Sequence, residues 1–282
     1  MTRKRTTISA SDVYKRQEFT LSGLRSGLRG RSFHAVFLLG VLLIGIAYLS
    51  GFFSPRQPQT VALDVGFSGV RFSLVLLNLF WVQELVAREI DRRVILFSLA
   101  YPVSRGAFLA GRLAAVLILS ALAATALGLL LLLAVTMVGG GYSQEFPPAL
   151  GLPFWSTIAG LAIDAAVVAA FALCIAALST VSVLPLALGA AFAVAGKALG
   201  ATVAYLARGA DGDEKMFASY DPLIRLIQWI LPDLSRLDWR EWSMYQLAPG
   251  AEMVFWSVTM AVAYIVLLLL AASLLFARRE FS

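Results

Sequence analysis

The sequence is poor in the residues that polar chemistry needs. It contains one cysteine, Cys174, and one histidine, His34. A single cysteine excludes a disulfide within the chain, and a single histidine argues against a histidine-based metal site or a Ser-His-Asp triad. Only 14% of the residues are charged, whereas an average soluble domain has about 25%. We therefore expect no catalytic residue and no metal site in this chain, and we do not expect it to be an enzyme.

The sequence also lacks a phosphate-binding loop of the form G-x-x-x-x-G-K-[ST]. The nearest match is Gly196 followed by Lys197, which lies inside an apolar stretch and has the wrong spacing. The chain is thus expected to bind no cofactor of its own. Any ATP and its magnesium ion would be bound by another subunit.

What the chain has in excess is hydrophobic residues, which make up 60% of it. They form runs long enough to cross about 30 Å of hydrocarbon, which takes about 20 helical residues. We predict an all-α polytopic membrane protein whose six transmembrane helices lie at residues 35–53, 66–86, 113–138, 154–179, 181–207 and 253–277. The short gap between the fourth and fifth spans predicts a tight helical hairpin.

The distribution of Lys and Arg gives the expected orientation, because cytoplasmic loops carry an excess of both. Basic residues predominate before the first span, after the second and at the end of the chain, whereas residues 208–252 contain more acidic than basic residues. We therefore expect cytoplasmic termini, a cytoplasmic loop at residues 87–107 and a segment on the outer side at residues 208–252. Residues 278–282 form a short cytoplasmic tail in this topology, and residues 35–277 form the transmembrane domain.

The N-terminal part divides in two. The stretch DVYKRQ at residues 12–17 is what a transposon end used in sequencing libraries encodes, so we expect residues 1–17 to be a non-native or disordered leader. Residues 18–34 mix Leu and Phe with regularly spaced Arg. That pattern is typical of a helix lying along the cytoplasmic interface of the bilayer.

The cytoplasmic loop at residues 87–107 is amphipathic. At its start, acids precede bases at i,i+4 spacing, from Glu84 at the end of the second span to Arg88 and from Glu89 to Arg93, which favours a helix. Pro102 disfavours a helical conformation at Tyr101, so the helix should end there. The residues that could engage a partner are Arg88, Glu89, Asp91, Arg92, Arg93, Phe97, Tyr101, Pro102 and Arg105.

Residues 89–112, EIDRRVILFSLAYPVSRGAFLAGR, resemble the first cytoplasmic loop of type-2 ABC exporter permeases. The resemblance lies in an acid-x-acid start, a Pro-Val-Ser-Arg core at residues 102–105 and a glycine, Gly111, that opens the next span. The ending FARREF at residues 276–281 is similar to the Arg-Arg-acid ending of that family. The stretch LPDLSRLDWREW at residues 231–242 resembles the outer segment of the branch grouped with nitrous-oxide-reductase maturation permeases.

The resemblance implies a permease subunit of an ATP-driven exporter in the cytoplasmic (inner) membrane of a bacterium or archaeon. It implies a homodimer whose loop at residues 87–107 is the coupling helix gripped by an ABC ATPase subunit. The almost uniformly apolar spans favour lipid-like, amphipathic or peptide cargo, or an outer-side partner, and no nucleic acid. One alternative remains open, a non-transporting membrane module that recruits a cytoplasmic partner through the same amphipathic loop.

The predicted hairpin of the fourth and fifth spans contains one acidic and one basic residue. Asp164 in the fourth span and Lys197 in the fifth are equally far from the connection, so a hairpin places them at equal depth, about 25 Å from the turn. Because a lone charge at bilayer depth costs about 2.5–3.5 kcal/mol, we predict that they form an ion pair. The pair would be either a static staple or a polar part of the transport route. Gly196 and Gly200 have the small-xxx-small spacing that permits close helix packing.

Overall fold

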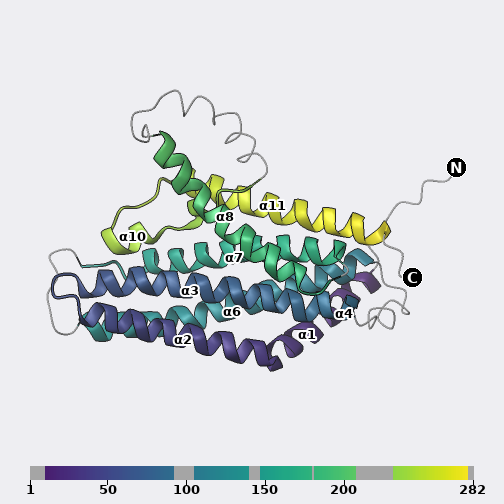
Figure 1. Ribbon diagram of the computed structural model, residues 1–282, viewed down its shortest axis with the longest axis horizontal. Coiled ribbons are helices and arrows are strands. Elements are labelled where there is room, and N and C mark those ends of the chain that lie inside the picture. The colour runs from purple at the N-terminus through teal and green to yellow at the C-terminus, as the bar shows by residue number, and fades with distance from the viewer. Residues whose placement is uncertain (1–9, 92–104, 140–146, 180, 208–230, 279–282) are drawn as a thin grey trace.

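The computed structural model describes residues 10–91, 105–139, 147–179, 181–207 and 231–278 (Figure 1). Helices are the only regular elements in these ranges. They are α1 (Ala10–Arg29), α2 (Arg31–Phe52), α3 (Pro58–Val82), the π-helix η1 (Gln83–Ala87), α4 (Arg88–Asp91), α6 (Arg105–Val138), α7 (Leu152–Leu178), α8 (Leu184–Ala207), the 3-10 helix η4 (Leu234–Leu237), α10 (Arg240–Tyr245) and α11 (Ala251–Arg278).

Five helices in the described ranges are long and apolar enough to cross a membrane. They are α2, α3 continued by η1, α6, α7 and α11. This confirms an all-helical, multi-pass membrane protein. The fifth predicted span corresponds to α8, whose apolar part, Leu184–Gly200, is shorter than the other five. The number six therefore stays a prediction.

The core of the bundle is built by α3, α6 and α7, which pack against one another and together carry most of the buried residues. Trp81, Phe67 and Phe154 are among its largest fully buried side chains. At the periphery, α2 packs on α3 and α11 packs on α7 (Figure 1). Most residues of both peripheral helices are at least partly exposed. Such apolar outer faces are what a helix in contact with lipid presents.

The N-terminal helices differ from the expected interfacial helix at residues 18–34. The helix α1 begins earlier, at Ala10, and ends at Arg29, while residues 31–34 belong to α2. The break falls at Gly30, whose extended backbone (φ −62°, ψ 135°) precedes the first turn of α2. Instead of standing apart, α1 packs on α6, where a Cβ at Gly23 would lie 2.8 Å from the Cβ of Ala115.

The two ends of the bundle carry different structures. At one end α3 runs through η1 into α4 as a continuous helix, beside α1 and the start of α6; we refer to this as the α4 end. At the opposite end lies α10 (Figure 1). There the chain from residue 231 to residue 245, with η4 and α10, crosses over α3, α7 and α8. We name residues 231–245 the strap and this end the α10 end.

Candidate functional site

The structure describes only some of the predicted coupling residues, and those it describes lie at the α4 end. Arg88, Glu89 and Asp91 lie in α4, and Arg105 is the first residue of α6. Arg92, Arg93, Phe97, Tyr101 and Pro102 lie outside the described residues, as does the predicted end of the helix at Tyr101.

Glu89 forms an ion pair inside the chain. Its carboxylate accepts a hydrogen bond of 2.6 Å from the Arg112 guanidinium of α6, and the Arg112 side chain is only 7% exposed. The same guanidinium lies 5.4 Å from the centre of the Phe108 ring and donates to the Ser22 hydroxyl of α1. Burial raises the pKa of Glu89 above its ordinary value, although Arg112 acts in the opposite direction. This pair ties α4 to α6 and leaves Glu89 engaged within the chain.

Glu84 organises the neighbouring turn of the same composite helix. It accepts a 2.6 Å hydrogen bond from the Ser32 hydroxyl of α2, and it lies 3.6 Å from the Arg88 guanidinium. The expected i,i+4 pair between Glu84 and Arg88 is thus present. The Arg88 side chain remains 49% exposed, so it can reach a partner beyond the bundle.

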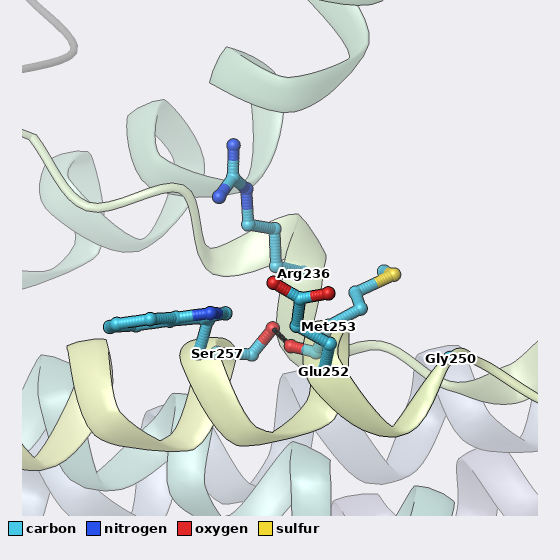
Figure 2. Close-up of a pocket in the computed structure, with 6 residues that line it drawn as sticks. Arg236, Gly250, Glu252, Met253 and Ser257 are labelled. Carbon is cyan, nitrogen blue, oxygen red and sulfur yellow. Dashed lines mark hydrogen bonds between the residues drawn. The ribbon is translucent and has the colours of Figure 1, made fainter.

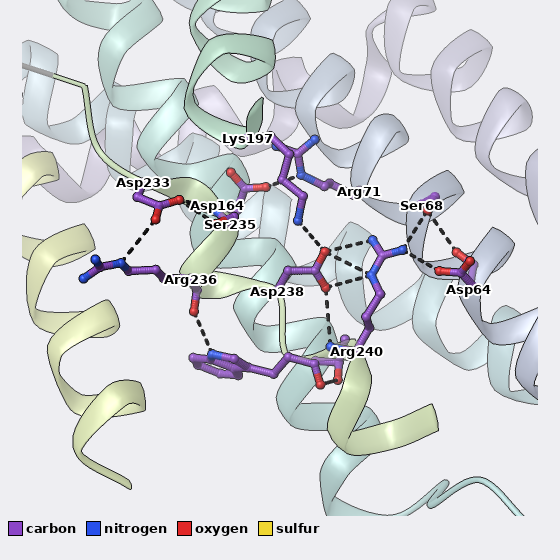
Figure 3. A network of polar contacts seen from close by, with 12 residues as sticks. Asp64, Ser68, Arg71, Asp164, Lys197, Asp233, Ser235, Arg236, Asp238 and Arg240 are labelled. Carbon is purple, nitrogen blue, oxygen red and sulfur yellow. Dashed lines mark hydrogen bonds and ion pairs between the residues drawn. The ribbon is translucent and has the colours of Figure 1, made fainter. Parts of the chain in front are cut away.

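At the α10 end, the predicted ion pair between Asp164 and Lys197 is corrected. Asp164 on α7 accepts a 2.5 Å hydrogen bond from the Nε of Arg71 on α3, whereas Lys197 on α8 pairs with Asp238 of the strap (Figure 3). Equal depth in a hairpin does not fix which way each helix turns its side chains. Arg71 therefore competes successfully for Asp164, because α3 packs against α7 along the core.

Asp238 lies at the centre of a charge network that joins the strap to two helices, α3 and α8 (Figure 3). Both of its oxygens accept from Arg240, at 2.9–3.0 Å, and one also accepts from Lys197. Arg240 in turn donates to Asp64 at 2.7 Å and to the Ser68 hydroxyl at 3.0 Å, both on α3. Two strap residues thereby bind α3 and α8 at once.

The electrostatics of this network favour the charged forms. Burial by itself raises the pKa of Asp238, but the hydrogen bonds and charges of Arg240 and Lys197 outweigh it and hold the pKa below its usual range. Burial likewise lowers the pKa of Arg240, and Asp238 and Asp64 more than offset this. Both groups therefore remain ionised at neutral pH.

Glycines let the strap approach the helices closely. A Cβ at Gly160 of α7 would overlap the Leu237 carbonyl oxygen, and one at Gly196 of α8 would lie 2.7 Å from a Leu234 methyl group. A Cβ at Gly200 would overlap the Ser235 hydroxyl. The sequence predicted that Gly196 and Gly200 permit close packing between helices, whereas the structure places the strap against both glycines.

Sequence reasoning missed most of the α10-end network, since it gave Arg71 no role and did not single out Asp64, Asp238 or Arg240. A signal was present: Asp64, Ser68 and Arg71 recur at i, i+4 and i+7, which places them on one face of α3. A polar stripe along an apolar helix predicts polar neighbours. The partners from the strap could not be read from any local pattern.

Two hollows flank the strap. One of about 320 Å³ is bounded by Asp64, Lys197, Asp238 and Glu241. The other, of about 650 Å³, lies between the strap and the start of α11, with Arg236 and Glu252 on its walls (Figure 2). Within the described ranges, no three His, Cys, Asp or Glu side chains are grouped so that they could hold a metal ion.

Comparison with known proteins assigns no function. No protein-family model matches the chain, and no curated protein matches it significantly. A functional proposal therefore has to come from the residues and their arrangement.

Proposed function

We propose that this chain is the membrane-spanning permease subunit of an ATP-driven ABC exporter of the type-2 class. The observation that best supports the proposal is the composite helix α3–η1–α4, which leads from the core of the bundle directly into the loop that resembles the family's coupling helix. Its end is fixed to α6 by the 2.6 Å pair between Glu89 and Arg112. A movement imposed on residues 87–107 would therefore be transmitted to two core helices together.

In the proposed topology, α8 is the fifth of six transmembrane helices and the α4 end is cytoplasmic. The basic residues support this orientation, because Arg25, Arg29, Arg31 and Arg88 are all exposed at the α4 end. Both termini are cytoplasmic, α1 lies at the cytoplasmic interface, and the strap faces the outer side. The membrane is the cytoplasmic membrane of a bacterium or archaeon.

The energy source in this proposal is a separate ABC ATPase subunit that binds ATP and magnesium. The permease acts as a homodimer, and the ATPase docks on residues 87–107 of each copy. Arg88 is the described residue best suited to that contact, since its side chain is half exposed and, within the described ranges, pairs with the neighbouring Glu84. Glu89 contributes indirectly, by holding α4 in place.

Affinity purification from the native membrane in mild detergent tests the proposal. We expect an ATPase with a phosphate-binding loop to co-purify, and its yield to fall several-fold in Arg88→Glu. The matched control is Arg56→Glu, which reverses an exposed charge at the opposite end of the bundle and should leave the yield unchanged. Repeated preparations that contain a cytoplasmic partner but no ATPase would instead support the non-transporting membrane module.

A further inference from the structure

Lys197 lies between two carboxylates that belong to different parts of the fold. It pairs with Asp238 of the strap, and its charge also acts on Asp164 of α7. A lysine ammonium group has three donors on a flexible stem, so it can exchange one acceptor for another by changing side-chain rotamers.

Asp164 has an unused acceptor for such an exchange. Its Oδ2 accepts from Arg71, but its Oδ1 is buried and has no hydrogen-bond partner. A buried carboxylate oxygen without a donor is unfavourable, because the water that would have solvated it has been lost. A second cation arriving at Asp164 would relieve that cost.

The strap carries its own counter-ions. Asp238 and Arg240 bind each other through both carboxylate oxygens, so the two charges remain paired if the strap leaves the bundle. Asp64, which would lose Arg240, is 54% exposed and can be hydrated. Lys197, which is only 29% exposed, would also lose its partner, unless it turns to Asp164.

We propose that Lys197 is a two-position switch and that the strap is a lid over the α10 end. In the closed arrangement, the one in the structure, Lys197 binds Asp238 and the lid rests on Gly160, Gly196 and Gly200. In the open arrangement Lys197 binds Oδ1 of Asp164, and the lid lifts with its Asp238–Arg240 pair intact. Each buried charge has a partner in both arrangements, so opening leaves no buried charge unpaired. Opening also exposes the buried Leu234, Leu237 and Trp239 side chains, so the closed arrangement is the more populated one.

The proposal goes beyond the transport function and does not depend on it, since a lid could serve a transporter or a recruiting module. It also gives the equal depth of Asp164 and Lys197 a role, because that depth is what lets them meet in the open state. The test needs only the chain itself in lipid nanodiscs, without nucleotide or partner.

The experiment is a distance measurement between two spin labels by pulsed electron paramagnetic resonance. One label is attached at Glu241 on the lid and the other at Phe53 at the end of α2, both exposed, in a Cys174→Ser background. Asp238→Asn weakens the closed pair, and we expect the population at longer distance to rise by about tenfold. Adding Asp164→Asn removes the negative charge that attracts Lys197 in the open state and should reduce that population several-fold.

The matched control is Asp233→Asn. Asp233 is on the same lid, but the partners of its carboxylate in the described part of the chain, Ser235 and Arg236, belong to the lid itself, so the distance should not change. If Asp164→Asn disturbs folding by stranding Arg71, the double change Arg71→Gln with Asp164→Asn removes both charges and carries the same expectation. The proposal is overturned if Asp238→Asn behaves like Asp233→Asn, or if removing the Asp164 charge leaves the open population unchanged.

Discussion

Two carboxylates at opposite ends of the bundle show how individual residues are stabilised here. Glu89 depends on a single buried arginine, and burial dominates its pKa. Asp238 has two cationic partners, which dominate its pKa instead. Removing the partner of Glu89 should therefore lower the stability of the protein strongly. Protonation of Asp238 at low pH should also lower the stability.

Arg112→Met should destabilise the protein strongly, because it leaves the Glu89 carboxylate largely buried without a counter-ion. Breaking a buried pair in this way costs about 3–5 kcal/mol. Glu89→Gln should lower the stability less than Arg112→Met does. The double variant, which carries both changes, should recover much of the stability that Arg112→Met loses. Thermal unfolding of the wild type, the two single variants and the double variant in one detergent measures these changes. If the loss of stability in the double variant equals the sum of the two single losses, a direct pair is contradicted.

The pH dependence of stability should reveal Asp238. Because the pKa of Asp238 is lower in the folded chain than its ordinary value of 3.8, the unfolded chain binds the proton more tightly. The stabilisation it gives is complete above that value and is lost as the pH falls through the folded pKa. Wild type should thus lose stability more steeply than Asp238→Asn below about pH 4. The melting temperatures of the two proteins are measured as a function of pH, and an equal decrease in both would contradict the network.

At the scale of elements, the apolar runs predicted where the membrane-spanning helices lie in the sequence. They did not predict which elements pack against one another. Long hydrophobic runs gave the positions of α2, α3, α6, α7 and α11, because hydropathy is averaged over many residues and tolerates local error. The packing of α1 on α6 and the course of the strap depend on contacts between residues far apart in the chain. No periodicity in the sequence encodes such contacts.

Gly160→Ala should loosen the strap. The new methyl group would overlap the Leu237 carbonyl oxygen, and backbone cannot move aside as a flexible side chain can. Overpacking of this kind costs about 1–3 kcal/mol. Limited proteolysis should cleave the strap faster in this variant. Gly151→Ala at the start of the same helix is the control, since a Cβ there meets nothing within 4 Å, and equal cleavage of both variants would contradict close contact of the strap with α7.

The molecule as a whole has one charged network at each end and an apolar bundle between them. At the α4 end, exposed arginines surround a helix that continues into the core, and at the α10 end a strap is held by ionic contacts. The sequence was sufficient to predict the membrane class and the presence of charges within the spans. It could not predict the partner of Asp164, since which side chains meet depends on the rotation of each helix about its own axis.

The central claim, that the α4 end receives an ATPase, is tested most directly by site-specific photocrosslinking in the native membrane. A photoreactive amino acid at Arg88 should form a covalent adduct with a protein that contains a phosphate-binding loop, whereas the same group at Arg56 should not. Adducts at Arg88 with other proteins only, in repeated experiments, would contradict the permease assignment.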